Sequence, residues 1–507
     1  MNAKIQQAAQ HTICLARHAL PHPEPATVRV VATVATAVLA ALTLVLSGCA
    51  SSAGIAPHAK ALEAQSVGVP APAEPTAAVV SDRWWTGFND PTLNSLVDRA
   101  LADSPSLRLA QARADRASAA AAGARANEGP RVDGSVDVTR QKYSANSIFP
   151  PPLGGSYQNS GNVQLTGSWE LDFFGRNRAL LDAAIGNERA AQVDVQAARI
   201  FLSSAVVREY VQLARWMEQR EIAERTLAQR TEVLGLIDQR VKAGLDTNVE
   251  LRQGEGAVPE LRAQLEAVNE QIALTRHALA ALTAQPPQAL DSLTPRLAGI
   301  QPIAMPEQIP ADLLGQRADI EAARLRAQAA SRTIDAAKAQ FYPNVSLTAF
   351  VGLNSLALGK LFEASSSQYG FGPALSLPIF DSGRLRANLS GTTAEYDAAV
   401  ESYNATLLSA VHDVADQISS VQSVARQLNE QAQSLQSAEQ AYDLAVQRYR
   451  AGLGNYLTVL TAENTVLTQR RVDADLRTRT LDSQVLLAQS LGGGYSAVKN
   501  ATVAAAQ

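Results

Sequence analysis

Cysteine and histidine are scarce in this chain. There are two cysteines, Cys14 and Cys49, and six histidines among 507 residues. No histidines stand in an HExxH pattern, and no cysteine and histidine have the spacing of a metal site. The sequence also lacks a GxSxG nucleophile elbow, a P-loop and a dinucleotide-binding fingerprint. We therefore expect a protein that is not an enzyme and that holds no cofactor and no metal.

A surplus of basic charge and a high aromatic content are missing too. The formal net charge is −4, so nothing indicates a nucleic acid as partner. Aromatic residues make up 5% of the chain, whereas alanine, glutamine, leucine, arginine and glutamate dominate from Trp84 to Gly494. These residue types are strong helix formers. The composition predicts a mainly helical protein in which small side chains let the helices approach closely.

A hydrophobic segment near the N-terminus is followed by a cysteine. It runs from Val30 to Leu46, follows a few basic residues, and leads into "LSGC", which ends at Cys49. This order is typical of a secretory signal peptide, and its last four residues resemble a bacterial lipobox. We expect residues 1–48 to be a signal peptide and Cys49 to carry lipid. The same resemblance implies that Ala50, in place of an aspartate after the cysteine, fits sorting to the outer membrane. The alternative is a transmembrane anchor, since 17 residues are at the short edge of the roughly 17 to 25 that span a bilayer.

The segment after this cysteine lacks the apolar periodicity of a folded element. Residues 49–83 are rich in alanine, serine and proline, and we interpret them as a lipidated flexible tether. Further along, residues 291–311 are expected to be a linker and residues 495–507 a C-terminal tail. Between these segments we expect two repeats, 84–290 and 312–494.

One short sequence occurs twice. "QRVKAGLD" at 239–246 returns 208 residues later as "QRYRAGLG" at 447–454, and an earlier glycine-arginine pair recurs at the same spacing. Between these marks lie residues 176–243 and 384–451, each of 68 residues without proline. At 1.5 Å per residue each stretch predicts one helix of about 100 Å. Such a helix must pack along its length against other helices.

Shorter helical stretches supply those partners. Residues 92–128, interrupted by Pro105, and residues 455–491 have 37 residues each, or about 55 Å as a helix. Two such stretches end to end match one long helix. Each repeat is therefore predicted as a short helix, a hairpin of strands, a long helix, a glycine turn and a short return helix.

Four segments alternate apolar and polar residues, which is typical of strands with one apolar face. Each is long enough to cross a bilayer, which takes roughly 9 to 11 tilted residues. Four strands are too few to close a barrel in lipid, so a membrane location demands two or three copies of the chain. The alternative is two water-soluble hairpins packed as a small sandwich. The predicted strands lie near residues 131–142, 162–173, 344–353 and 369–380.

Several longer motifs follow one another in a recognisable order. They are "WWTGFNDPTLNSLVDRAL", "WELDFFGR", "LLGQRADIEAAR", "QFYPNVSL", "PIFDSGR" and "AGLGNYLTVLTAEN". On these motifs the chain resembles the outer membrane factors, the TolC-like channel components of tripartite efflux pumps, in their lipoprotein (OprM/NodT-type) branch. One departure is Ala318, where the family usually has proline.

The resemblance implies a mainly α fold with a membrane β-barrel portion. The two tandem repeats of three chains would form a twelve-stranded barrel and a twelve-helix periplasmic tunnel. It also implies a homotrimer in the bacterial outer membrane, lipid-anchored through Cys49, with most of the chain in the periplasm. The implied partners are a periplasmic adaptor protein and an inner-membrane pump of the RND type.

The two glycine turns are the first part of the candidate site. Glycine adopts left-handed backbone angles without steric cost, so the need for a helix cap is enough to explain both glycines. The resemblance adds that the turns meet the periplasmic adaptor. The residues concerned are Gly244, Leu245, Gly452 and Leu453.

The resemblance also places a constriction just beyond the second turn. Leu457, Thr461 and Asn464 lie on one helical face at i, i+4 and i+7. Relatives usually have a charged residue at the position of Thr461, and some have arginine at that of Asn464. Rings of charge are how pores select ions, so the neutral residues predict closure by a leucine ring with a weaker salt-bridge lock. The alternative is that Leu457 is an ordinary packing residue.

Acidic residues stand on the polar sides of the first two predicted strands. We expect Asp133, Asp137, Glu170 and Asp172 to line the lumen and to favour cations mildly. The predicted function is the outer membrane channel of a tripartite efflux pump, a passive duct that receives its substrate from the pump through the adaptor. The alternatives are a lipid-tethered coiled-coil spacer and a channel for type I protein secretion.

Overall fold

The computed structural model describes residues 51–63, 66, 81–146, 148–303 and 317–495. The signal peptide and Cys49 lie outside the described residues, as do most of the tether, part of the linker and residues 496–507. The described residues form two compact units, and each unit takes segments from both repeats. We call them the strand unit, built mainly from Val132–Phe174 and Ala337–Ser390, and the helical unit, which holds the long helices. The compact units therefore cut across the two sequence repeats.

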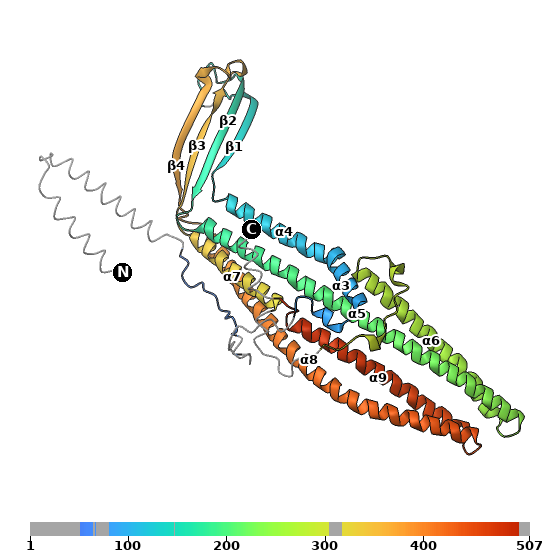
Figure 1. Cartoon of the computed structure of the whole chain (residues 1–507). Coiled ribbons are helices and arrows are strands. Elements are labelled where there is room, and N and C mark those ends of the chain that lie inside the picture. The colour runs from blue at the N-terminus through green and yellow to red at the C-terminus, as the bar shows by residue number, and fades with distance from the viewer. Residues whose placement is uncertain (1–50, 64–65, 67–80, 147, 304–316, 496–507) are drawn as a thin grey trace. The chain divides into compact units, whose positions relative to one another are not determined.

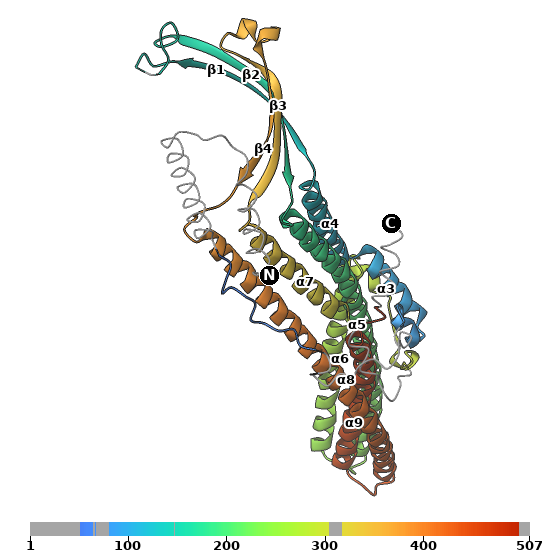
Figure 2. The same ribbon diagram turned by 90° about the vertical axis from the view of Figure 1, so that its left-hand side faces the viewer.

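The strand unit is one sheet of four strands. Its order is β1-β2-β3-β4 (Figure 1), and Figure 2 shows from a second side that the sheet is curved. The antiparallel pair β2 and β3 joins the two repeats, with Leu165 opposite Val351, and β3 in turn places Val351 opposite Tyr369. The register therefore gathers the apolar side chains on one face. The strands are β1 (Arg131–Lys142), β2 (Tyr157–Leu171), β3 (Asn344–Ser355) and β4 (Ser367–Ser376).

Strand ends differ from those expected. β2 begins at Tyr157 rather than near residue 162, because its first residues pair without showing an alternating apolar pattern. It ends before Asp172, where the chain turns toward Gly175 in a left-handed conformation with φ 75°. β4 ends at Ser376 instead of near residue 380, since Pro378 has no backbone N–H to continue the ladder.

Two long helical hairpins dominate the helical unit. The long helices α5 and α8 have 67 residues each, about 100 Å of helix. Each ends one residue before the expected position, and each turns into a return helix of 35 residues (Figure 1). The bounds are α5 (Arg176–Lys242), α6 (Asn248–Leu282), α8 (Arg384–Arg450) and α9 (Tyr456–Ser490).

The predicted helical stretch 92–128 is two helices. α3 (Pro91–Asp103) and α4 (Pro105–Ala126) are separated by Ser104, whose ψ is 127°. A proline disfavours helical angles for the residue before it, so Pro105 breaks the stretch and then starts the next helix. The second repeat has one short helix at this place, α7 (Ala318–Ala339).

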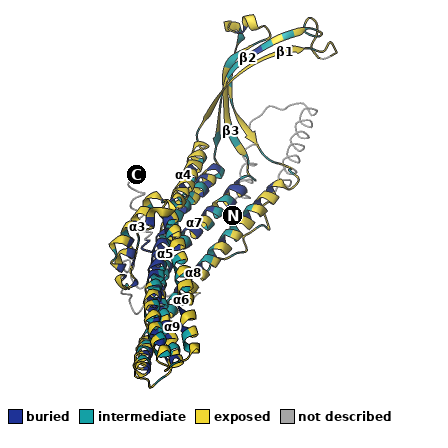
Figure 3. Ribbon diagram, turned by 90° about the vertical axis from the view of Figure 1, so that its right-hand side faces the viewer, coloured by how far each residue is buried: buried dark blue, intermediate teal, exposed yellow. Residues whose placement is uncertain are grey.

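Helix α5 is the centre of the helical unit, where it packs against α3, α4, α6 and α9. Figure 3 shows buried positions in dark blue along it, whereas the strands are mostly exposed or intermediate. Trp85 and Phe88 lie fully buried against it. A Cβ built on Gly186 of α5 would lie 2.9 Å from the Cβ of Ala329 on α7. The two helices therefore approach as closely as the alanine-rich composition predicts.

The linker, the tail and part of the tether are better packed than expected. Leu297 and Ile300 of the linker are buried in the core around Trp85, and Tyr495 of the tail is also buried. An alternating pattern is not needed for this, because single apolar side chains fill gaps between helices.

Residues 58–62 of the tether lie along α8. The backbone N–H groups of His58 and Ala59 donate to the Asp397 carboxylate at 3.0 Å, and that of Leu62 donates to Asn404 Oδ1 at 2.8 Å. In the structure these residues of the predicted tether are therefore held against α8. An extended segment has no partners of its own for its N–H groups, and α8 supplies them.

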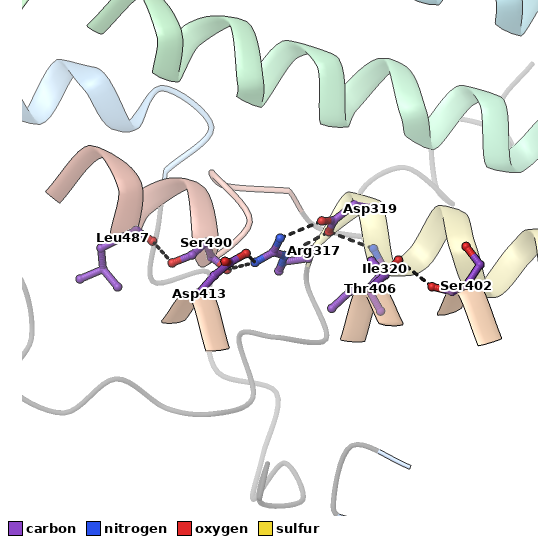
Figure 4. A network of polar contacts seen from close by, with 8 residues as sticks. All are labelled: Arg317, Asp319, Ile320, Ser402, Thr406, Asp413, Leu487 and Ser490. Carbon is purple, nitrogen blue, oxygen red and sulfur yellow. Dashed lines mark hydrogen bonds and ion pairs between the residues drawn. The ribbon is translucent and has the colours of Figure 1, made fainter. Parts of the chain in front are cut away.

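A second network fixes the start of α7. Arg317 donates to both carboxylate oxygens of Asp319, to Asp413 on α8 and to the carbonyl of Ser490 at the end of α9 (Figure 4). Ala318, where proline was expected, begins the helix and is buried. The network joins three helices without needing that proline. Of the helices within the described residues, none has a stretch apolar enough to cross a membrane.

Candidate functional site

The two turns of the helical hairpins close in the same way. In the first, Gly244 has φ 68° and the N–H of Leu245 donates to the carbonyl of Arg240 at 2.9 Å. In the second, Gly452 has φ 76° and the N–H of Leu453 donates to the carbonyl of Arg448 at 2.8 Å. A left-handed glycine with such a long-reaching bond is the Schellman motif. Both glycines are therefore explained by the backbone.

The backbone geometry of the turns does not explain the exposed side chains of Leu245 and Leu453. Their side chains are 66% and 70% exposed, and they stand at the ends of two neighbouring hairpins. Large exposed apolar side chains at a loop tip are informative when they are paired in this way. They are available to a partner.

Asp246 ties the first turn to the second helical hairpin. Its carboxylate accepts from Arg240 Nε at 2.8 Å and from Arg240 Nη2 at 3.1 Å, and it also accepts from the Tyr449 hydroxyl. The Arg240 guanidinium lies 4.6 Å from the centre of the Tyr449 ring and donates to the Tyr449 carbonyl. The hydrogen bonds from Arg240, followed by that from Tyr449, hold the pKa of Asp246 below its ordinary value. Burial raises the pKa of Tyr449, so its hydroxyl stays protonated.

The predicted aperture residues lie on one face of α9. Leu457, which is 61% exposed, Thr461 and Asn464 are all exposed, while the intervening Val459 and Glu463 are buried. Thr461 donates to the carbonyl of Leu457 at 2.8 Å. The face is thus formed within one chain, and Leu457, Thr461 and Asn464 stay exposed among the residues that the structure describes.

Asn464 has a partner that the sequence did not reveal. Arg230 of α5 donates through Nη2 to Asn464 Oδ1 at 2.7 Å, through Nε to Glu463 Oε2 at 2.9 Å, and through Nη1 to the carbonyl of Ala257 on α6 at 3.3 Å. Arg230 and Glu463 are each 7% exposed. Burial raises the pKa of Glu463, and the charge of Arg230 opposes that rise.

Within the described part of the chain, this ion pair is the last of three that link α5 to α9. Arg208 pairs with Asp482 at 2.6 Å and Arg215 with Asp475 at 2.6 Å, both partly exposed. The arginines are seven residues apart on α5 and the aspartates seven apart on α9. This antiparallel spacing was the one signal in the sequence, and it is legible only when the two helices are known to be neighbours. We call the three pairs the α5–α9 ladder.

The predicted lumen acids belong to the strand unit. Asp133 and Asp137 lie on β1 with exposed side chains, and Glu170 stands opposite Ser346 on the polar face of β2 and β3. Asp172 falls one residue beyond β2. The same polar face carries an amide cluster in which Gln368 donates to Asn162 at 3.1 Å and to Gln164 at 3.2 Å.

No cluster of three or more metal-type ligands occurs among the residues that the structure describes. His277 lies on α6 and His412 on α8. The turns and the aperture face therefore hold groups suited to binding and sealing, with no constellation for chemistry.

The sequence profile described as "Outer membrane efflux protein" matches residues 96–285 and 309–493. The chain is 33% identical over 482 residues to the multidrug resistance outer membrane protein MdtQ of Escherichia coli O157:H7, which covers 90% of this chain and 97% of that protein. It is 36% identical over 371 residues to the fusaric acid resistance protein FusA of Burkholderia cepacia, covering 71% of this chain and 69% of FusA.

A solved structure agrees with these relatives. The outer membrane protein VceC of Vibrio cholerae matches with a TM-score of 0.77 and 35% identity, over 82% of this chain and 100% of that one.

Proposed function

Because the chain belongs to the outer membrane efflux protein family and is an outer membrane channel of an efflux system, we propose that three copies form one passive duct. In this assembly three four-stranded sheets close a twelve-stranded barrel, and the helical hairpins continue it as a twelve-helix tunnel. Substrate enters from an inner-membrane pump of the RND type through a periplasmic adaptor. The family is one of channels rather than enzymes.

The apolar face of the sheet is the observation that carries this proposal. It runs over both repeats, with exposed Val136, Leu165, Val351, Tyr369 and Phe371. In water such a face is costly, at about 25 cal/mol for each Å² of apolar surface. In lipid it is favourable, but the backbone groups at the sheet edges then need partners. Further copies of the same sheet supply them.

We assign membrane anchoring to the N-terminal segment and adaptor binding to the two helical hairpin turns. We propose that residues 1–48 are a signal peptide and that Cys49 carries lipid in the outer membrane. Gly244, Leu245, Gly452 and Leu453 form the surface that meets the adaptor, supported by the exposure of both leucines.

The inner surface of the duct is assigned in the same way. Leu457, Thr461 and Asn464 form the periplasmic aperture, supported by their shared exposed face on α9. Asp133, Asp137, Glu170 and Asp172 line the barrel lumen and favour cations. A reversal potential that is unchanged in the double variant Glu170→Gln/Asp172→Asn would contradict the role of these acids.

Small organic molecules are the proposed substrates. The names of the relatives speak of multidrug resistance and fusaric acid resistance, which supports this class over metal ions and secreted proteins.

The test is the mass of the complex in mild detergent, measured by light scattering with the detergent subtracted, followed by single-channel recording. We expect a mass of three mature chains, ion conductance, and a larger conductance in Leu457→Ala than in wild type. A non-conducting monomer would replace the channel with the lipid-tethered spacer. Export of an unfolded polypeptide with no effect on drug susceptibility would replace efflux with type I secretion.

A further inference from the structure

The α5–α9 ladder changes in character toward the turns. Its first two ion pairs are partly exposed, with Arg208 and Asp482 at 46% and 23% and Arg215 and Asp475 at 26% and 41%. The third pair is buried, and it is the one next to the aperture face. A partly exposed pair contributes little to stability because water screens it. A buried pair resists being broken because one charge would remain without a partner.

The buried pair is not optimised for stability. Glu463 Oε1 is buried and has no hydrogen-bond partner among the described residues, and its charge also acts on the phenols of Tyr442 on α8 and Tyr456 on α9. Apolar residues at such a place are often equally stable or more stable. A half-satisfied carboxylate that persists in the core therefore calls for a role other than stability.

Geometry indicates that role. The guanidinium of Arg230 binds two consecutive residues of α9, of which Glu463 points into the core and Asn464 belongs to the exposed aperture face. A planar guanidinium fixes the directions of its hydrogen bonds, which an ammonium does not. The third bond, to the Ala257 carbonyl, ties the same group to α6. One side chain of the first hairpin thus fixes the rotation of α9 at the aperture.

We propose that Arg230 is a positioning residue of the channel, which holds the aperture face of α9 in its closed orientation from within each chain. This inference rests on the proposed function. It adds to the predicted leucine ring a tie that lies behind the aperture, between the two hairpins of one chain. The sequence did not predict a role for Arg230, since no motif lies near it.

The first test is single-channel recording of Arg230→Met. Methionine keeps much of the volume and loses the three bonds, so we expect the ratio of open to closed channel to rise about tenfold. The matched control is Arg208→Met, which removes an arginine from the same helix and an ion pair to the same partner helix. We expect the control to conduct like wild type.

A second variant protects the test against misfolding. Glu463→Gln keeps the shape and an acceptor for Arg230 but removes the charge whose burial is costly, so we expect it to keep the tie and to stay closed at least as often as wild type. The double variant Arg230→Met/Glu463→Leu leaves no buried charge. It should open as often as Arg230→Met if the lost tie is the cause.

The pH profile is a readout that a purely structural role would not move. Burial raises the pKa of Glu463 in the closed arrangement, whereas a released α9 would hydrate the carboxylate and return the pKa toward its ordinary value. Protons therefore bind the closed state more tightly, and acidification should favour closure. Glu463→Gln should abolish this response.

The outcomes are distinguishable. If wild type conducts while Arg230→Met leaves opening unchanged and Glu463→Gln leaves the pH profile unchanged, Arg230 has no positioning role and the channel function stands. If Arg208→Met opens the channel as much as Arg230→Met, the ion pairs of the α5–α9 ladder hold the closed state equally, and the assignment to Arg230 fails. If wild type forms no channel, the proposed function fails and takes this inference with it.

Discussion

Arg240 and Arg448 occupy the same position in the two helical hairpins, yet they do different things. Each stands 208 residues from the other, one turn before its glycine, and the carbonyl of each accepts the closing bond of its turn. The Arg240 side chain is 12% exposed and binds Asp246 and Tyr449. The exposed Arg448 makes one bond of 3.3 Å, to the carbonyl of Leu453. A repeated sequence thus fixes the backbone of a turn while leaving the role of its side chains open.

The difference comes from two neighbours. The position of Asp246 in the first turn is taken by Gly454 in the second, and that of Val241 by Tyr449. The first turn therefore supplies the acid and the second supplies the phenol. The tie forms between the turns because they are unequal.

Arg240→Met should have the largest effect on stability of the substitutions at the two turns. It leaves the nearly buried Asp246 carboxylate without its cation, and we expect a loss of about 3 kcal/mol in the free energy of unfolding of the helical hairpins. Arg448→Met is the matched control and should stay within about 0.5 kcal/mol of wild type. Denaturant unfolding followed by far-UV circular dichroism measures both. Equal losses would mean that Asp246 does not distinguish the two turns.

Substitution of the turn glycines should show where the two hairpins remain alike. A Cβ at Gly244 or Gly452 meets no atom within 4 Å, so only the left-handed backbone opposes alanine, at about 1 to 2 kcal/mol for each turn. Gly235→Ala, in the interior of α5 with open space around it, should instead stabilise the helix by about 0.5 to 1 kcal/mol. The same unfolding assay applies. A cost confined to one turn would show that the closures are not equivalent.

Lowering the pH should weaken the first turn, with a smaller effect than the substitutions above. The pKa of Asp246 is lowered from 3.8 by its bonds from Arg240 and Tyr449, so its stabilising contribution is complete above that value and is lost as pH falls through the lowered pKa. Asp246→Asn removes the contribution at every pH. The difference in melting temperature between wild type and Asp246→Asn should therefore narrow only below about pH 4. A gap that closes near neutral pH would refute the lowered pKa.

The architecture was readable from local patterns. The absence of proline over 176–243 and 384–451 predicted α5 and α8 almost to the residue. A long helix needs only a run of helix-forming residues that no proline interrupts. Alternation predicted the four strands but not their ends, as at Tyr157, where polar residues continue the ladder. The interruption expected at Pro105 is the break between α3 and α4. The error at Pro378 arose where the geometry of one proline overrides a longer pattern.

The side-chain ties were not readable. Arg230 with Glu463, and Asp397 with the backbone of His58, join segments hundreds of residues apart, so neither partner carries a local mark. Asn464 was placed on the aperture face by resemblance, and its binding to Arg230 depends on the register of α5 against α9. A repeat even misleads here, because it makes Arg240 and Arg448 look interchangeable.

Compact units that cut across the repeats have a consequence for biogenesis. β2 pairs with β3, and α5 packs against α9, and in each case the partner belongs to the other repeat. Closing such long loops is slow, and a chain delivered from its N-terminus first has its earlier half exposed while the later half is still arriving. The apolar surface that the first repeat buries against the second is therefore exposed until the second repeat has been delivered.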